Sequence, residues 1–87
     1  MHNAVRIDVS DNVATVLRDV SESERIRWDE GSALAAREPI PEGHKVALVD
    51  IAEGQVVRKY GHPIGLAGRK IPAGSHVHTH NLAKEEV

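Results

Sequence analysis

The part of this sequence best suited to chemistry is a row of histidines near the C-terminus. His76, His78 and His80 stand two residues apart, with the β-branched residues Val77 and Thr79 between them. Because side chains alternate faces along a β-strand, this spacing predicts a strand that carries three imidazoles on one face. Such a row can bind a metal ion, receive an anionic substrate or move protons near neutral pH.

A second candidate site is the tripeptide Gly43-His44-Lys45. Gly43 allows a tight turn whose backbone amides could face an anion. Lys45 could pair with a carboxylate, and His44 could act as an acid, a base or a metal ligand. The alternative interpretation is a solvated turn with an exposed charge.

Other polar residues have simpler explanations. Asp11 and Asn12 are typical of a turn in which Asx side chains bond the backbone. Tyr60 is expected to be a core aromatic with a polar tip rather than a catalytic phenol. His2 and His62 lie outside any motif and are expected at the surface.

The elements that must position these residues are short strands. Alternation of Val5, Ile7 and Val9 with polar residues predicts a half-buried strand, and the apolar run 13–17 predicts its hairpin partner. Segment 21–37 is ambiguous, because Ser-x-x-Glu at 21–24 fits a helix capping box. We prefer a hairpin there, since Asp-Glu-Gly at 29–31 is typical of a turn and alternating residues precede it.

A short phrase recurs three times in the second half of the chain. Ile-Pro-Glu-Gly at 40–43, Ile-Ala-Glu-Gly at 51–54 and Ile-Pro-Ala-Gly at 71–74 each precede a β-branched run. Pro and Gly in these places are typical of type I turns, so three turn-then-strand units are predicted. Their spacing is too uneven for a solenoid. An apolar strand is predicted over 46–51, and a glycine-rich turn over 60–65.

Length and composition predict one small all-β domain over 1–82, followed by a short charged tail at 83–87. The chain has 87 residues, 40% of them hydrophobic and only 2% aromatic, so the core must be aliphatic and a partner would help to stabilise it. A net charge of −2 argues against nucleic acid as the main ligand. The absence of cysteine excludes disulfides and thiolate chemistry. No apolar signal or membrane-spanning segment is seen, so a cytoplasmic location is expected.

Four segments together resemble a known family. They are Asp11-Asn12-Val13-Ala14; Ile40-Pro41-Glu42-Gly43-His44-Lys45-Val46-Ala47-Leu48; Lys59-Tyr60-Gly61 with Ile64-Gly65; and His76-Val77-His78-Thr79-His80-Asn81. Over roughly residues 5–81 the chain resembles the SAF domain of the altronate and galactarate dehydratase family, and the sulfolactate sulfo-lyase small subunit is similar. The resemblance implies a β-clip fold.

The resemblance also implies a function. The chain would be a small subunit or N-terminal domain of a sugar-acid hydro-lyase, and so a non-autonomous component of a carbon–oxygen lyase. A large subunit would carry most of the active site, and homo-oligomers are possible. A divalent metal, Fe²⁺ or Mn²⁺, would be held by His78 and His80, with His76 as a further ligand or support.

Other roles follow from the same resemblance. His44, Lys45 and His78 would serve catalysis. Substrate contacts would come from Asp11, Asn12, Lys45 and Asn81. The alternative is a non-catalytic or regulatory module that binds a sugar acid without transforming it.

Overall fold

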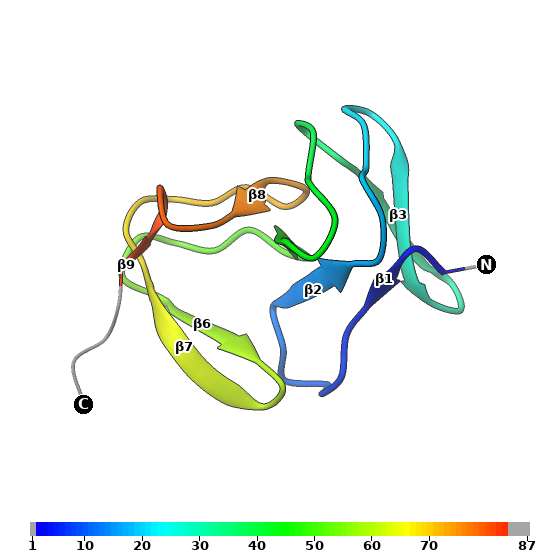
Figure 1. Cartoon of the computed structure of the whole chain (residues 1–87). Helices are drawn as coiled ribbons and strands as arrows, with labels where there is room; N and C mark the ends of the chain where they lie inside the picture. Colours follow the sequence, from blue (N-terminus) through cyan, green and yellow to red (C-terminus); the bar gives the residue numbers. More distant parts are fainter. Residues whose placement is uncertain (1, 84–87) are drawn as a thin grey trace.

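Three small antiparallel sheets make up the computed structural model, which describes residues 2–83 (Figure 1). The strands are β1 (Ala4–Val5), β2 (Val13–Val16), β3 (Arg25–Asp29), β4 (Ser32–Ala35), β5 (Lys45–Ala47), β6 (Val56–Lys59), β7 (His62–Ala67), β8 (His76–Val77) and β9 (Leu82–Ala83). The all-β prediction is confirmed. Across the described residues there is no helix with the length and apolar character that a membrane span requires.

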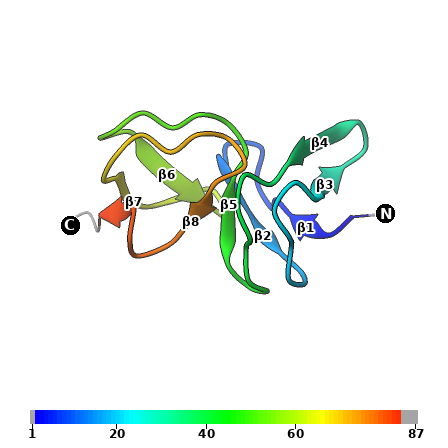
Figure 2. The same ribbon diagram turned by 90° about the horizontal axis from the view of Figure 1, so that it is seen from above.

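The central sheet has the strand order β1-β2-β5-β8, and it brings distant parts of the chain together. β5 pairs with β2 on one side and with β8 on the other, where Val46 faces His76 and Lys45 faces Val77. Figure 2 shows the β3–β4 hairpin at one end of the molecule and β6 and β7 at the other, with β5 between them. Strands from the N-terminal and C-terminal halves of the chain, β2 and β8, therefore meet at β5.

The two halves of the fold repeat one another at an interval of 31 residues. Val20 and Ile40 exchange two backbone hydrogen bonds of 2.9 and 2.8 Å, and Ile51 and Ile71 exchange two more of 2.8 Å. Each member of the second pair lies 31 positions after its counterpart in the first. The turn motif Ile-Ala-Glu-Gly at 51–54 is therefore the structural counterpart of residues 20–23. Their sequence, Val-Ser-Glu-Ser, differs too much from the motif for the repeat to be recognised there.

Side chains that hold the turns repeat in the same way. The Oδ1 atom of Asp19 accepts a 2.8 Å hydrogen bond from the backbone N–H of Glu42. The Oδ1 atom of Asp50 accepts a 2.8 Å bond from the backbone N–H of Ala73. Each aspartate fixes a turn that leads into β5 or β8, the two strands next to the candidate histidines.

Two aliphatic clusters form the core, one in each repeat. The first contains Val16, Val20, Ile26, Ala36, Ile40 and Val46; their counterparts in the second are Ala47, Ile51, Val57, Ala67, Ile71 and Val77. All are nearly or fully buried. Burying one large aliphatic side chain contributes about 1.5–3 kcal/mol, so these clusters can hold a domain that has few aromatic residues.

The hairpin interpretation of segment 21–37 is confirmed. β3 and β4 pair in antiparallel fashion, with a turn at Glu30 and Gly31. Trp28 is partly buried and packs against the first core cluster. The tail predicted at 83–87 falls mostly outside the described residues, and Ala83 belongs to β9.

Several predicted strands are shorter in the structure. β1 ends at Val5, and Ile7 and Val9 are exposed in a loop, so a continuous strand over 5–9 was wrong. The loop forms because Asp8 captures local donors, including the backbone N–H of Ser10 at 2.8 Å. Asx side chains commonly divert the backbone in this way.

The strand predicted over 46–51 and the turn predicted over 60–65 also need correction. β5 ends at Ala47 because the chain bends toward the second repeat, where Ile51 pairs with Ile71. Only Tyr60 and Gly61 form the turn between β6 and β7, because pairing resumes at His62. Tyr60 is 51% exposed and is not a core aromatic.

Candidate metal centre

The histidine segment forms a turn rather than the predicted strand. β8 ends at Val77, and the chain then folds back through residues 78–81. The side chain of Asn81 closes this turn: its Oδ1 accepts from the backbone N–H of His78 (3.0 Å), and its Nδ2 donates to the carbonyl of His76 (2.8 Å). A buried Asn that satisfies both backbone groups competes with strand pairing, and this explains the error.

The turn nevertheless gathers the imidazoles, and it adds one from outside the segment. The ring centroids of His76 and His78 lie 5.4 Å apart, and those of His76 and His80 lie 5.4 Å apart. The ring of His44 stacks on that of His78 at 4.4 Å and lies 5.0 Å from that of His76. We call these four residues the histidine cluster.

His44 reaches the cluster through the pairing of β5 with β8. It directly precedes β5, and its backbone N–H donates to the carbonyl of Pro41 (3.0 Å), which closes the turn before the strand. Because Val46 pairs with His76, the residue two positions before Val46 projects on the same side as His76. Gly43 supports this turn with a φ of 82°, a conformation that suits glycine.

Three members of the cluster lie close enough together to hold a metal ion. Ligand nitrogens of His44, His76 and His78 all lie within 4.8 Å of one another, and each of these residues is half-buried. The Nδ1 atom of His44 is 2.8 Å from Nε2 of His76. Imidazole nitrogens bind divalent transition metals at about 2.0–2.1 Å, so small ring rotations would let one ion contact all three. His80 lies outside this group of three.

The surroundings of His76 and His78 favour neutral imidazoles. Burial lowers the pKa of His76 first, the neighbouring histidines lower it further, and Glu38 opposes them weakly. Burial and then the charges of His44 and Lys45 lower the pKa of His78. A neutral imidazole is the form that binds a metal, so these shifts suit a ligand role.

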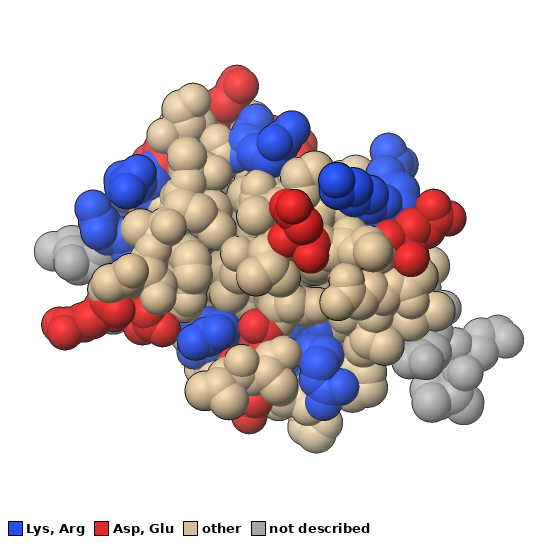
Figure 3. All heavy atoms as spheres, turned by 180° about the vertical axis from the view of Figure 1, so that it is seen from behind, with Lys and Arg blue, Asp and Glu red and all other residues tan. Residues whose placement is uncertain are grey.

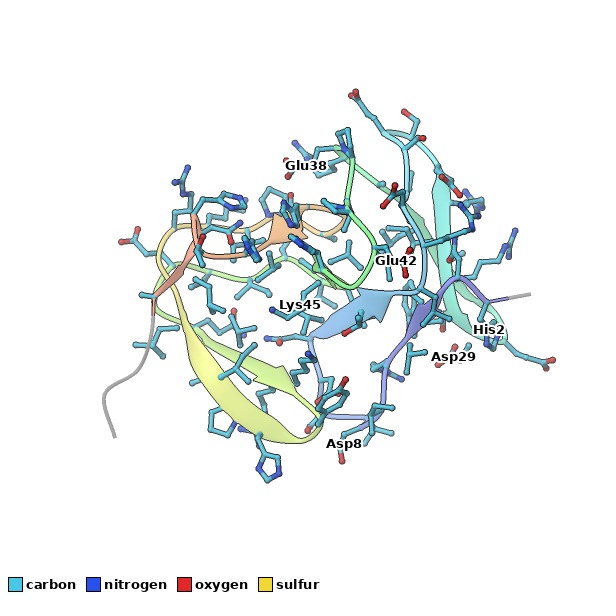
Figure 4. All side chains as sticks on the ribbon, in the orientation of Figure 1. His2, Asp8, Asp29, Glu38, Glu42 and Lys45 are labelled. Carbon is cyan, nitrogen blue, oxygen red and sulfur yellow. The ribbon has the colours of Figure 1, made fainter. Side chains whose placement is uncertain are left out.

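Lys45 adds a cation close to the cluster. Burial lowers its pKa, and the charge of Lys59 lowers it further. In Figure 4, Lys45 and Glu38 lie on opposite sides of β8. The side of the cluster nearer Lys45 is therefore suited to an anionic group.

The family of this chain follows from comparison with known proteins. The sequence profile of the altronate/galactarate dehydratase SAF domain matches residues 2–85. The chain belongs to this family. The resemblance carried by the sequence motifs is therefore confirmed.

The relatives of this SAF domain are larger proteins or named subunits. It is 46% identical to altronate dehydratase of Escherichia coli (strain K12) over 77 residues, which cover 88% of this chain and 15% of that protein. It is 44% identical to galactarate dehydratase (L-threo-forming) of the same organism over 82% of this chain and 13% of that protein. It is 48% identical to (2R)-sulfolactate sulfo-lyase subunit alpha of Paracoccus pantotrophus over 55% of this chain and 72% of that subunit. The SAF domain thus spans about a sixth or less of the dehydratases that it matches.

Asp11 serves to hold loops of the SAF domain together. Its buried carboxylate accepts backbone hydrogen bonds from Gly61 (2.7 Å), Tyr60 (2.9 Å) and Asp8 (3.1 Å). Burial alone would raise the pKa of Asp11, but the three N–H donors lower it overall. The carboxylate joins the loop after β1 to the turn between β6 and β7.

Asn12 is also engaged by the backbone. Its Oδ1 accepts from the N–H of Arg58 (2.8 Å), and its Nδ2 donates to the carbonyl of Val56 (2.9 Å). Of the substrate contacts expected from the resemblance, Lys45 and Asn81 lie beside the histidine cluster. Asp11 and Asn12 instead fix the loops around β6, and His2 and His62 are exposed as expected.

Glu38 is a neighbour of the cluster that the sequence did not reveal. Its Oε2 accepts a 3.1 Å hydrogen bond from the backbone N–H of His76. Glu38 follows the β3–β4 hairpin, a segment that carried no motif. Only the folding of that hairpin toward β8 brings the two residues together.

Proposed function

We propose that this SAF domain contributes histidines to the active site of a sugar-acid hydro-lyase, most of which lies in a larger subunit or in a further region of the same protein. The observation that supports this most is the convergence of three imidazole nitrogens within 4.8 Å on a half-buried surface. The names of the dehydratase relatives and the small share of them that this chain covers support the same proposal. We also propose a cytoplasmic location.

In this proposal a divalent metal ion, Fe²⁺ or Mn²⁺, is held by His44, His76 and His78. Imidazole ligands suit such ions, and three protein ligands leave coordination positions for a substrate. When bound, the ion would polarise a substrate oxygen as a Lewis acid. His80, which was expected as a ligand, lies beside this set.

The remaining polar residues would then act on the substrate. Lys45 would pair with the carboxylate of the sugar acid, because a half-buried ammonium beside the histidine cluster is a favourable partner for an anion. Dehydration removes a proton from C2 and expels the hydroxyl of C3 as water. An imidazole that does not hold the ion, such as His80, would donate the proton that the leaving hydroxyl takes up.

Calorimetric titration with Mn²⁺, and with Fe²⁺ under anaerobic conditions, tests the site. We expect saturable binding by the 87-residue chain and its loss in a His76→Ala/His78→Ala variant. His62→Ala is the matched control, because His62 is exposed and lies outside the cluster. Binding that is equal in the double variant and in the wild type would contradict the proposal.

A second experiment separates a lyase component from a binding module. We expect no dehydration of altronate or galactarate by the chain alone, and activity when the chain is combined with the remainder of the enzyme. The double histidine variant should restore much less activity than His62→Ala. Full restoration by the double variant would favour the non-catalytic alternative.

A further inference from the structure

A hollow of about 200 Å³ lies between the N-terminal segment and β3, away from the histidine cluster. Its lining consists of His2, Asn3, Arg18, Arg25 and Arg27. Three arginines around one small concavity make a concentrated positive charge in a chain whose net charge is −2. Figure 3 shows basic side chains near the left edge of the molecule, where β3 of Figure 1 lies after the 180° turn, and others elsewhere on this face.

The backbone beneath two of these arginines is fixed by Asn3. Its Nδ2 donates to the carbonyl of Arg25 (3.0 Å), and its Oδ1 accepts from the N–H of Arg27 (2.8 Å). Its own N–H donates to the carbonyl of Arg27 (3.1 Å). Arg25 and Arg27 are exposed on one face of β3, while Ile26 between them is buried in the core. Three hydrogen bonds from Asn3 therefore hold the backbone that carries Arg25 and Arg27.

The charge of the hollow is only partly neutralised within the described residues. Arg18 pairs with Glu24, with 2.6 Å between Nη2 and Oε2. Among residues 2–83 neither Arg25 nor Arg27 forms an ion pair. A guanidinium stays charged at any physiological pH, and its fork of N–H donors matches the oxygens of a phosphate or carboxylate. Such donors in a concave site are suited to an anion.

We propose that this hollow binds a small oxyanion, with Arg25 and Arg27 as the principal donors. The volume of about 200 Å³ admits a phosphate or a small carboxylic acid. In Figure 4, His2 lies at the right-hand end of the molecule, whereas Lys45 and Glu38 lie nearer its middle. The anion site is thus separate from the proposed lyase site, and neither depends on the other.

Titration of the ¹⁵N-labelled chain with inorganic phosphate, followed by NMR, tests this site. We expect saturable shifts centred on Asn3, Arg25 and Arg27. An Arg25→Gln/Arg27→Gln variant should bind phosphate at least about tenfold more weakly, because two charge-assisted contacts are lost. The matched control is Arg37→Gln/Lys70→Gln, which removes the same charge from exposed positions elsewhere.

A parallel titration with malonate, a dicarboxylate, identifies the preferred oxyanion. Tighter binding of either ligand at the same residues supports the site and names its class. Shifts spread evenly over all basic residues would overturn the proposal, and so would equal weakening by both double variants. Because no metal takes part, the result is independent of the calorimetric test of the histidine cluster.

Discussion

The Nδ1 atom of His44 lies 2.8 Å from the Nε2 atom of His76, although 32 residues separate them in the chain. A hydrogen bond at this distance requires that one nitrogen donates its N–H and the other accepts it through a lone pair, so the two rings would have complementary tautomers. This relationship joins the turn before β5 to the start of β8. It also sets the geometry from which a metal would be bound.

This pairing predicts a hydrogen-bonded imidazole N–H in the metal-free chain. We expect ¹⁵N NMR at neutral pH to detect a ring proton on His44 or His76 that exchanges slowly with water. The signal should disappear in His76→Ala, because that variant lacks one of the two rings. It should also disappear on addition of Zn²⁺, because both nitrogens would then be metal ligands. Exchange as fast as that of the exposed His62 would show that the pair does not form.

Replacing Asn81 with Ala should disturb both stability and metal binding. The variant leaves the N–H of His78 and the carbonyl of His76 without partners, at a cost of about 1–3 kcal/mol of unfolding free energy. Metal affinity should fall as well, because the turn that holds His78 relaxes. Urea denaturation and calorimetry measure the two effects.

Asn12→Ala is the matched control for that experiment. Asn12 also bonds one backbone N–H and one carbonyl, those of Arg58 and Val56, but far along the chain from the cluster. We expect a similar loss of stability with unchanged metal affinity. An equal loss of affinity in both variants would show that Asn81 acts only through global stability.

The stability of the folded chain should depend on pH through the carboxylate of Asp11. Its pKa is lowered in the folded state from an ordinary value of 3.8, so the unfolded chain takes up the proton first as the pH falls. The contribution of ionised Asp11 to the free energy of unfolding is therefore complete above the ordinary pKa of 3.8. It is lost as the pH falls toward the lower pKa of the folded state. Asp8 and Glu24, whose pKa values are also lowered, contribute in the same direction.

The Asp11→Asn variant isolates the contribution of this carboxylate. An amide cannot accept from three N–H groups as well as a carboxylate does, and we expect a loss of about 1–3 kcal/mol at pH 7. The difference from the wild type should shrink between pH 4 and pH 2, as measured by urea denaturation. A difference that stays constant over that range would contradict an ionised Asp11.

The internal repeat predicts a stabilising substitution at Ser23. Ser23 has a φ of 73°, and its counterpart 31 residues later, Gly54, has a φ of 83°. Residues with a Cβ pay about 1 kcal/mol in this conformation, so Ser23→Gly should raise the free energy of unfolding by about 0.5 kcal/mol after the entropy cost of glycine. Thermal or urea denaturation measures the gain.

Two variants control this prediction. Ser21→Gly, two residues earlier and without a positive φ, should destabilise the chain. Gly54→Ser should also destabilise it, through backbone conformation alone, because no atom lies within 4 Å of a Cβ placed there. A loss of stability in Ser23→Gly would mean that the hydroxyl matters more than the backbone strain.

Much of the architecture follows from local pattern. Apolar runs predicted both hairpins, although the strand expected over 5–9 ends at Val5, and the turn at 29–31 decided between helix and hairpin for segment 21–37. The motifs around residues 40–48 and 76–81 were enough to indicate the SAF family. These features depend on neighbours in the chain, whose preferences the residue types carry directly.

Tertiary structure decided which side chains meet. The His-x-His spacing predicted a strand, but the buried Asn81 closes a turn in its place, and the pairing of β5 with β8 brings in His44 rather than His80. Glu38 joins His76 by a similar long-range contact, and Asp11 is committed to the turn between β6 and β7. The sequence by itself determined that this is a small all-β SAF domain rich in histidine. Only the fold determined the group of three imidazoles, because contacts between residues 30 or more positions apart depend on strand pairing that local pattern does not encode.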